Sequence, residues 1–163
     1  MMRFFVVLLL SVFLVATAGC GKKTPESQVA PGPGMARPIQ PTAIDFEKVK
    51  EVAPAGDFAT AIDKDVKPVL ATVFGGAKLF NSFAMGDQGS HLIYALKRQA
   101  KADDLAAVKK KLEAKGYKFI TEAPRSGIET FSFEKKLSDK TYGVTLGLTP
   151  GDQRVSVVIF KQG

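Results

Sequence analysis

The fold is decided by Tyr142-Gly143-Val144-Thr145-Leu146-Gly147-Leu148-Thr149, whose residues alternate strictly in size. Large apolar residues occupy every second position, and glycine or threonine occupies the positions between them. Successive side chains of a β-strand point to opposite faces of its sheet. The stretch therefore predicts a strand with one apolar face and one face that is nearly free of side chains.

Further alternating segments lie on both sides of this stretch and predict further strands. The first two are separated by 86–90, a turn segment with two glycines, which predicts a hairpin. In the first of them, Leu79, Phe83 and Met85 are expected on one face. The alternating segments are 79–85, 92–96, 117–121, 131–134 and 155–159.

One helix is clear in the pattern, over residues 103–115. Asp103 is a good N-cap, and Asp104 is favourable at the positive end of the helix dipole. Gly116 follows where a left-handed residue usually ends a helix. Its apolar stripe consists of Leu105, Val108 and Leu112.

Two helical segments are expected before the first strand. Residues 42–52 have the spacing of a short helix, and 57–74 keep an approximate helical period that Pro68 interrupts. We therefore expect 57–74 to form a turn or short helix up to Asp65 and then a separate helical turn. All elements together predict an α+β domain over 42–163. Its antiparallel sheet has about five strands in the order β-β-α-β-β-β, and one main helix and the short N-terminal helical segments cover its apolar face.

The N-terminus has the composition of an export signal. A positive charge at Arg3 precedes an apolar run over 4–15, which is shorter than the roughly 20 residues that cross a bilayer. The run ends in Val15-Ala16-Thr17-Ala18-Gly19-Cys20, which resembles the lipobox of bacterial lipoprotein precursors. Residues 16–18 also fit an ordinary A-x-A cleavage site, which would release a soluble protein.

The resemblance to lipoprotein precursors implies a signal peptide for export and a lipid anchor in the membrane. Residues 1–19 would be a signal peptide, and Cys20 would carry a diacylglycerol group and a further acyl chain such as palmitate. Gly21, rather than aspartate, follows the cysteine, so the resemblance implies the periplasmic face of the outer membrane. Residues 20–41 would form the lipidated N-terminus and a tether rich in proline and glycine, with a reach on the order of 60 Å.

The composition limits the kinds of binding partner that we expect for the chain. It has 23 basic and 16 acidic residues, a net charge of +7. A solvated basic surface explains this charge, and contact with anionic lipid is the alternative. Nucleic acid is not expected, because the chain reads as exported and shows no RNA-binding motif. Cys20 is the one cysteine, so the domain is expected to depend on its core rather than on a disulfide.

The glycine and threonine positions of the opening stretch are the first candidate binding feature. Gly143, Thr145, Gly147 and Thr149 would line a flat face, here called the Gly/Thr row. Glycine weakens a strand unless something approaches it closely. Either a helix of the same domain or an external partner could do so.

A basic stretch on the predicted helix is the second candidate. Lys109, Lys110 and Lys111 could contact an acidic partner, and a solvated helix face is the alternative.

No catalytic residue, metal ligand set or cofactor motif is predicted. His91 is the only histidine, and its neighbour Ser90 would point to the opposite face of a strand, so the two do not form a nucleophile–base pair. The chain is therefore not expected to be an enzyme or to hold a metal or cofactor.

These observations favour a non-catalytic binding or assembly accessory domain that docks an envelope partner. An exposed last strand over 154–161 would support docking by strand addition. The alternative is a carrier or sensor of a small apolar or anionic ligand, held in a pocket between sheet and helix.

Overall fold

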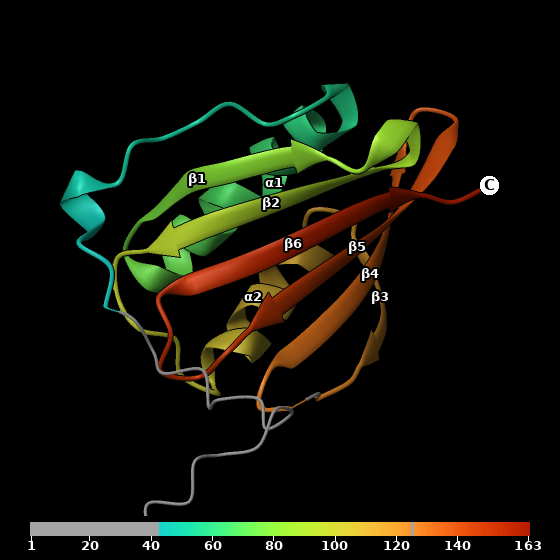
Figure 1. Cartoon of the computed structure of the whole chain (residues 1–163). Helices are drawn as coiled ribbons and strands as arrows, with labels where there is room; N and C mark the ends of the chain where they lie inside the picture. Colours follow the sequence, from blue (N-terminus) through green and yellow to red (C-terminus); the bar gives the residue numbers. More distant parts are fainter. Residues whose placement is uncertain (1–42, 125) are drawn as a thin grey trace, which may run out of the picture. The chain divides into compact units, whose positions relative to one another are not determined.

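The computed structural model describes residues 43–124 and 126–163 (Figure 1). The predicted signal peptide, Cys20 and the tether over 20–41 lie outside these residues. The described part is an α+β fold with an antiparallel sheet, as predicted.

The sheet has six strands, one more than the prediction of about five. Both short alternating segments after the helix form strands of their own, β3 and β4. The order across the sheet is β1-β2-β6-β5-β4-β3, and all neighbours pair antiparallel. The strands are β1 (Ala77–Ala84), β2 (Gly89–Leu96), β3 (Lys118–Glu122), β4 (Glu129–Leu137), β5 (Lys140–Leu148) and β6 (Arg154–Lys161).

The last strand, β6, lies inside the sheet. It pairs with β2 on one side and with β5 on the other, so the exposed last strand that would have supported docking by strand addition is not present over 154–161. The edges are β1 and β3. Residues 49–55 run along β1 in Figure 1, and the Val52 amide donates to the Leu79 carbonyl at 2.9 Å. Strand order depends on contacts between distant segments, which alternation within one segment does not specify.

The helix α1 (Asp57–Phe74) is continuous, so the prediction of two pieces separated near Pro68 is wrong. Proline inside a helix costs about 3 kcal/mol. Burying one large apolar side chain contributes about 1.5 to 3 kcal/mol, so several of them on one face outweigh that cost. The buried residues of α1 are Ala59, Ile62, Val66, Val69, Leu70 and Phe74. The short helix expected over 42–52 is reduced to the 3-10 turn η1 (Phe46–Lys48).

The helix α2 (Asp104–Glu113) ends as predicted, with Gly116 at a φ of +80°. The Tyr117 amide donates to the Leu112 carbonyl at 3.1 Å and the Gly116 amide to the Glu113 carbonyl at 2.9 Å, which is the Schellman arrangement. Asp103 occupies the predicted N-cap position, but its side chain makes no capping hydrogen bond.

The carboxylate at the start of α2 is that of Asp104. It accepts the Lys101 amide at 2.8 Å and two hydrogen bonds from Arg98 at 2.7 and 2.8 Å. Arg98 also donates to the Val73 carbonyl at 2.7 Å, so one guanidinium joins the ends of α1, β2 and α2.

Both helices cover the same face of the sheet, and the core lies between them and the sheet (Figure 1). The helices bury Leu70 and Leu112, and β5 buries Val144 and Leu146 against them. One space among the core side chains, beside Leu70 and Leu146, measures about 10 Å³, close to the minimum for one water molecule. This part of the core is therefore tightly packed.

Candidate functional site

The Gly/Thr row faces away from both helices. On β5, the alternate residues Tyr142, Val144, Leu146 and Leu148 are buried in the core, so the row between them lies on the opposite face. We call this opposite face the outer face. Neither α1 nor α2 lies on it, so packing by one of these helices does not explain the glycines, and that expectation is wrong.

The outer face combines residues from five strands. The pairing register places them there together with the Gly/Thr row. They are Asn81 and Phe83 of β1, His91 and Ile93 of β2, Ser156, Val158 and Phe160 of β6, and Thr130, Ser132 and Glu134 of β4.

Gly143 is covered by a side chain of the neighbouring strand. The Phe160 ring lies so close that a Cβ built on Gly143 would be 2.3 Å from its Cζ and 2.5 Å from its Cε2. Atoms do not approach so closely without displacing one another, so the ring needs a glycine beneath it. The close approach that the sequence implies is made by Phe160 rather than by a helix.

Apolar side chains gather at one end of the outer face, which we call the aromatic end. It consists of Phe83, Met85, His91, Val158 and Phe160. Phe83 and Phe160 are each 44% exposed, and Met85 is 41% exposed. The rings of Phe83 and His91 meet edge to face with centroids 4.9 Å apart, and Val158 pairs with His91 in register. Figure 1 shows the β1–β2 turn and the C-terminal end of β6 at the same end of the sheet.

The alternation of β1 does not reveal the aromatic end. Leu79 pairs with Tyr94 and is buried, but an irregularity between Leu79 and Asn81 shifts the register. Phe83 therefore points to the outer face, and the expectation that Leu79 and Phe83 share a face is wrong. A register shift of this kind turns every later side chain of a strand to the other side.

The other end of the outer face is a pocket of about 270 Å³, which we call the hollow. Gly147 and Thr149 of the Gly/Thr row line it, so the structure brings two of the predicted binding residues together here. Arg154 also lines it, and its guanidinium pairs with the buried Asp152 at 2.9 Å. The hydrogen bond to Asp152 raises the pKa of Arg154, so the guanidinium at the hollow stays protonated.

A histidine and a serine meet beside the hollow. His91 Nε2 lies 2.5 Å from Ser156 Oγ, although the residues are 65 positions apart in the chain. Burial lowers the pKa of His91 and so favours its neutral imidazole form. Ser90, the neighbour in sequence, is buried, and its hydroxyl donates to the Ala55 carbonyl at 2.8 Å. Sequence reasoning missed the Ser156 pairing because only the strand register creates it.

The pair lacks the other parts of a nucleophilic site. A catalytic base is normally oriented by a third group, and the second ring nitrogen of His91 has no hydrogen-bond partner among the described residues. Ser156 and His91 also lie on paired central strands, where the backbone N–H groups are used by the sheet. Among residues 43–124 and 126–163, these two strands therefore offer no pair of free N–H groups to an oxyanion there.

The three lysines of the second candidate lie on α2, away from the outer face, and they diverge. Lys109 Nζ sits 3.4 Å from the centroid of the Phe119 ring. Lys110 is exposed, and Lys111 lines a groove of about 260 Å³ between α1 and α2. The structure does not bring these lysines together with the Gly/Thr row.

The described residues contain no group of three His, Cys, Asp or Glu side chains that could hold a metal ion. Their helices are also too short or too polar to span a bilayer. Cys20, the predicted lipid site, lies outside them.

Comparisons with known proteins found no match to this chain among family models, curated proteins or solved structures.

Proposed function

We propose that this chain is a lipid-anchored cell-envelope protein whose folded part docks an envelope partner protein through the outer face. The observation that carries the proposal is the aromatic end. Three large apolar side chains there, Phe83, Met85 and Phe160, are each more than 40% exposed within one group. Single exposed apolar residues are ordinary, whereas a group of them marks a contact surface.

The chemistry of the aromatic end suits a protein partner. Aromatic residues and methionine are enriched in protein interfaces, and charged residues are depleted at interface centres. Phe160 stands on β6, which is paired on both sides, and Phe83 stands on the edge strand β1, which is paired with β2, so both rings project from ordered backbone. Docking would then order few further groups, which lowers the entropic cost of association.

The hollow would extend this contact. Its walls include Ile93 and Ile128, and Gly147 leaves its base open. A side chain of the partner could enter it while the aromatic end provides the apolar anchor. Because β6 is paired on both sides, docking would proceed by surface complementarity rather than by strand addition to β6.

Two other functions have less support. A carrier of an apolar ligand has less support, because the space beside Leu70 and Leu146 measures about 10 Å³ and the larger pocket between sheet and helix, about 340 Å³ beside α2, carries the charged side chains Glu122 and Glu129. Hydrolysis by Ser156 and His91 would need an oriented base and oxyanion donors, which the site geometry does not supply.

A photo-reactive residue at position 160 tests the proposal in intact cells. Phe160 would be replaced by benzoyl-phenylalanine, and Ile120 would be replaced in the same way as the matched control. Ile120 is 51% exposed and lies on the edge strand β3, three strands away from β6. The expected result is one dominant protein adduct from position 160 and no such adduct from position 120.

Two outcomes would contradict the proposal. The first is an equal pattern of adducts from both positions, which would show unspecific contact. The second is a lipid adduct alone from position 160, which would make the aromatic end a membrane contact. Replacement of Phe83 by serine should weaken a genuine adduct at position 160, because the two side chains belong to one surface.

A further inference from the structure

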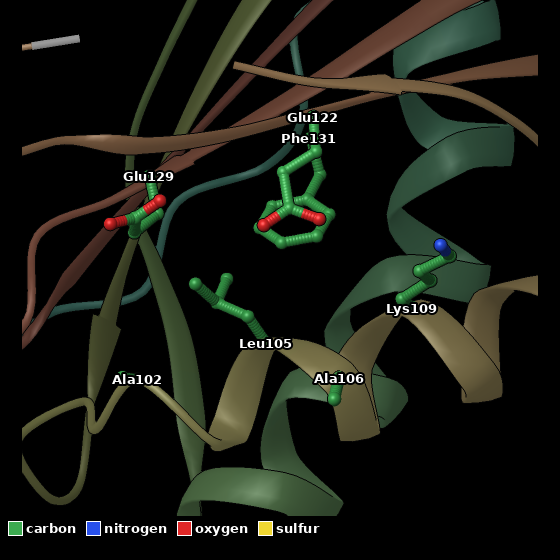
Figure 2. Close-up of a pocket in the computed structure, with 7 residues that line it drawn as sticks. All are labelled: Ala102, Leu105, Ala106, Lys109, Glu122, Glu129 and Phe131. Carbon is green, nitrogen blue, oxygen red and sulfur yellow. The ribbon is translucent and has the colours of Figure 1, made fainter. Parts of the chain in front are cut away.

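A pocket of about 340 Å³ opens between the start of α2 and the strands β3 and β4 (Figure 2). Leu105 and Phe131, 7% and 5% exposed, form its apolar lining. Ala102, in the turn before α2, and Ala106, in the first turn of α2, also line the pocket, and their short side chains leave room. The volume is in the range of small-molecule sites.

Two carboxylates stand at this pocket. Glu122 on β3 pairs in register with Phe131 on β4, and Glu129 precedes Phe131 by two residues. All three side chains therefore point to the helix-covered face of the sheet. Figure 2 shows both carboxylates at the pocket, with that of Glu122 in front of the Phe131 ring and that of Glu129 beyond the tip of Leu105.

Neither carboxylate is neutralised within residues 43–124 and 126–163. No hydrogen bond or ion pair joins the side chain of Glu122 or Glu129 to another of these residues. Lys109 also lines the pocket, but its Nζ lies 3.4 Å from the centroid of the Phe119 ring and forms no ion pair with either glutamate. Within the described residues, a chain with a net charge of +7 thus leaves two negative groups without a partner beside Leu105 and Phe131.

We infer that this pocket binds a primary alkylammonium group. The ammonium would lie between the carboxylates of Glu122 and Glu129, and its methylene chain would lie on Leu105 and Phe131. An anionic ligand, the earlier expectation for a pocket between sheet and helix, is disfavoured by the two carboxylates. Two kinds of ligand could present this alkylammonium group: a free alkylamine, or the side chain of a lysine in a peptide.

Protection of the sheet edge does not account for the whole arrangement. An inward-pointing charge on an edge strand deters pairing with other chains, and Glu122 on β3 can serve that purpose. Glu129 lies on β4, which is paired on both sides, and needs another reason. The inference is also independent of the proposed docking, because α2 lies on the face opposite to the outer face.

Titration of the whole protein with n-hexylammonium, followed by amide NMR shifts, tests the inference. The matched uncharged probe is 1-hexanol. We expect shifts at Leu105 and Ala106 with n-hexylammonium, and roughly tenfold weaker binding with 1-hexanol. Nα-acetyl-lysine methylamide then separates the sources: tighter binding than n-hexylammonium indicates a lysine side chain, and weaker binding indicates a free amine.

Three variants make the test specific. The Glu122→Gln, Glu129→Gln double variant should bind n-hexylammonium at least about tenfold more weakly. Glu113→Gln, at an exposed position at the far end of α2, should bind like the unchanged protein. Ala106→Leu places a good helix former at an exposed position and fills the pocket, so it should fold normally and lose binding.

The inference is overturned if n-hexylammonium causes no amide shift at Leu105 and Ala106 at concentrations up to about 50 mM. Equal binding of 1-hexanol would also overturn it, as would an unchanged affinity of the double variant. Cross-linking from position 160 should be unaffected by Ala106→Leu, so a failure here and a failure of the docking proposal are distinguishable.

Discussion

Replacement of Gly143 by alanine tests whether the Phe160 ring occupies the space above that glycine. The added Cβ would lie 2.3 to 2.8 Å from three ring atoms of Phe160. Because Phe160 is 44% exposed, its ring can rotate into solvent instead of forcing the strands apart. The substitution should therefore remove the contact of the ring with β5 and leave the sheet intact.

Two effects of opposite sign determine the magnitude. Complete burial of a phenylalanine contributes about 1.5 to 3 kcal/mol, and about half of Phe160 is buried, so the lost contact costs about 1 kcal/mol or slightly more. Alanine is favoured over glycine inside a strand by about 0.5 to 1 kcal/mol. Gly143→Ala should thus lower the free energy of unfolding by between about zero and 1 kcal/mol.

A double-mutant cycle isolates the contact. In a Phe160→Ala protein no ring opposes the new Cβ, so Gly143→Ala should become stabilising by about 0.5 to 1 kcal/mol. The coupling energy between the two positions should be about 1 kcal/mol, measured by equilibrium urea unfolding of the four proteins. Additivity within about 0.4 kcal/mol would refute the reasoning, since independent sites add to that precision.

Three further predictions concern the anchor, the start of α2 and the serine. Cys20→Ser should move the protein from the membrane fraction to the soluble fraction and remove the acylated N-terminal peptide from its mass spectrum; continued membrane association would contradict the anchor. The hydrogen bonds from Arg98 hold the pKa of Asp104 below its ordinary value, so Asp104 stabilises the fold above the unfolded-state pKa near 4 and loses this effect as pH falls through the lower folded-state pKa. Asp104→Asn should therefore destabilise the protein by about 1 kcal/mol at pH 7 in urea unfolding, with a smaller difference from the unchanged protein below about pH 4; a difference that does not vary with pH would contradict this. A serine-directed fluorophosphonate should not label Ser156, and labelling that disappears in His91→Ala would instead indicate a hydrolase.

The local elements of the fold were largely predictable because each depends on a period within one segment. The strict alternation of 142–149 identified β5 and the face it buries. The stripe of α2 and Gly116 at its end identified that helix and its last turn. Such patterns follow from the geometry of strands and helices alone, so they need no knowledge of distant contacts.

The candidate site was predictable only in part. The Gly/Thr row marked one strand of the outer face, and the hollow contains two of its members. The aromatic end was missed because a register shift in β1 turns Phe83 outward. The two carboxylates of the α2 pocket were missed because they come from two strands that only pairing brings together.

By itself, the sequence determined the α+β class, the face that β5 buries and the end of α2, since the size and spacing of neighbouring side chains decide these features. Only the tertiary structure decided that α1 continues through Pro68, because the burial of its apolar face outweighs the local cost of proline. It also decided that β6 lies inside the sheet and that Phe160 covers Gly143. Strand order, register and side-chain cover are set by the free energy of contacts between distant segments, which no local pattern encodes.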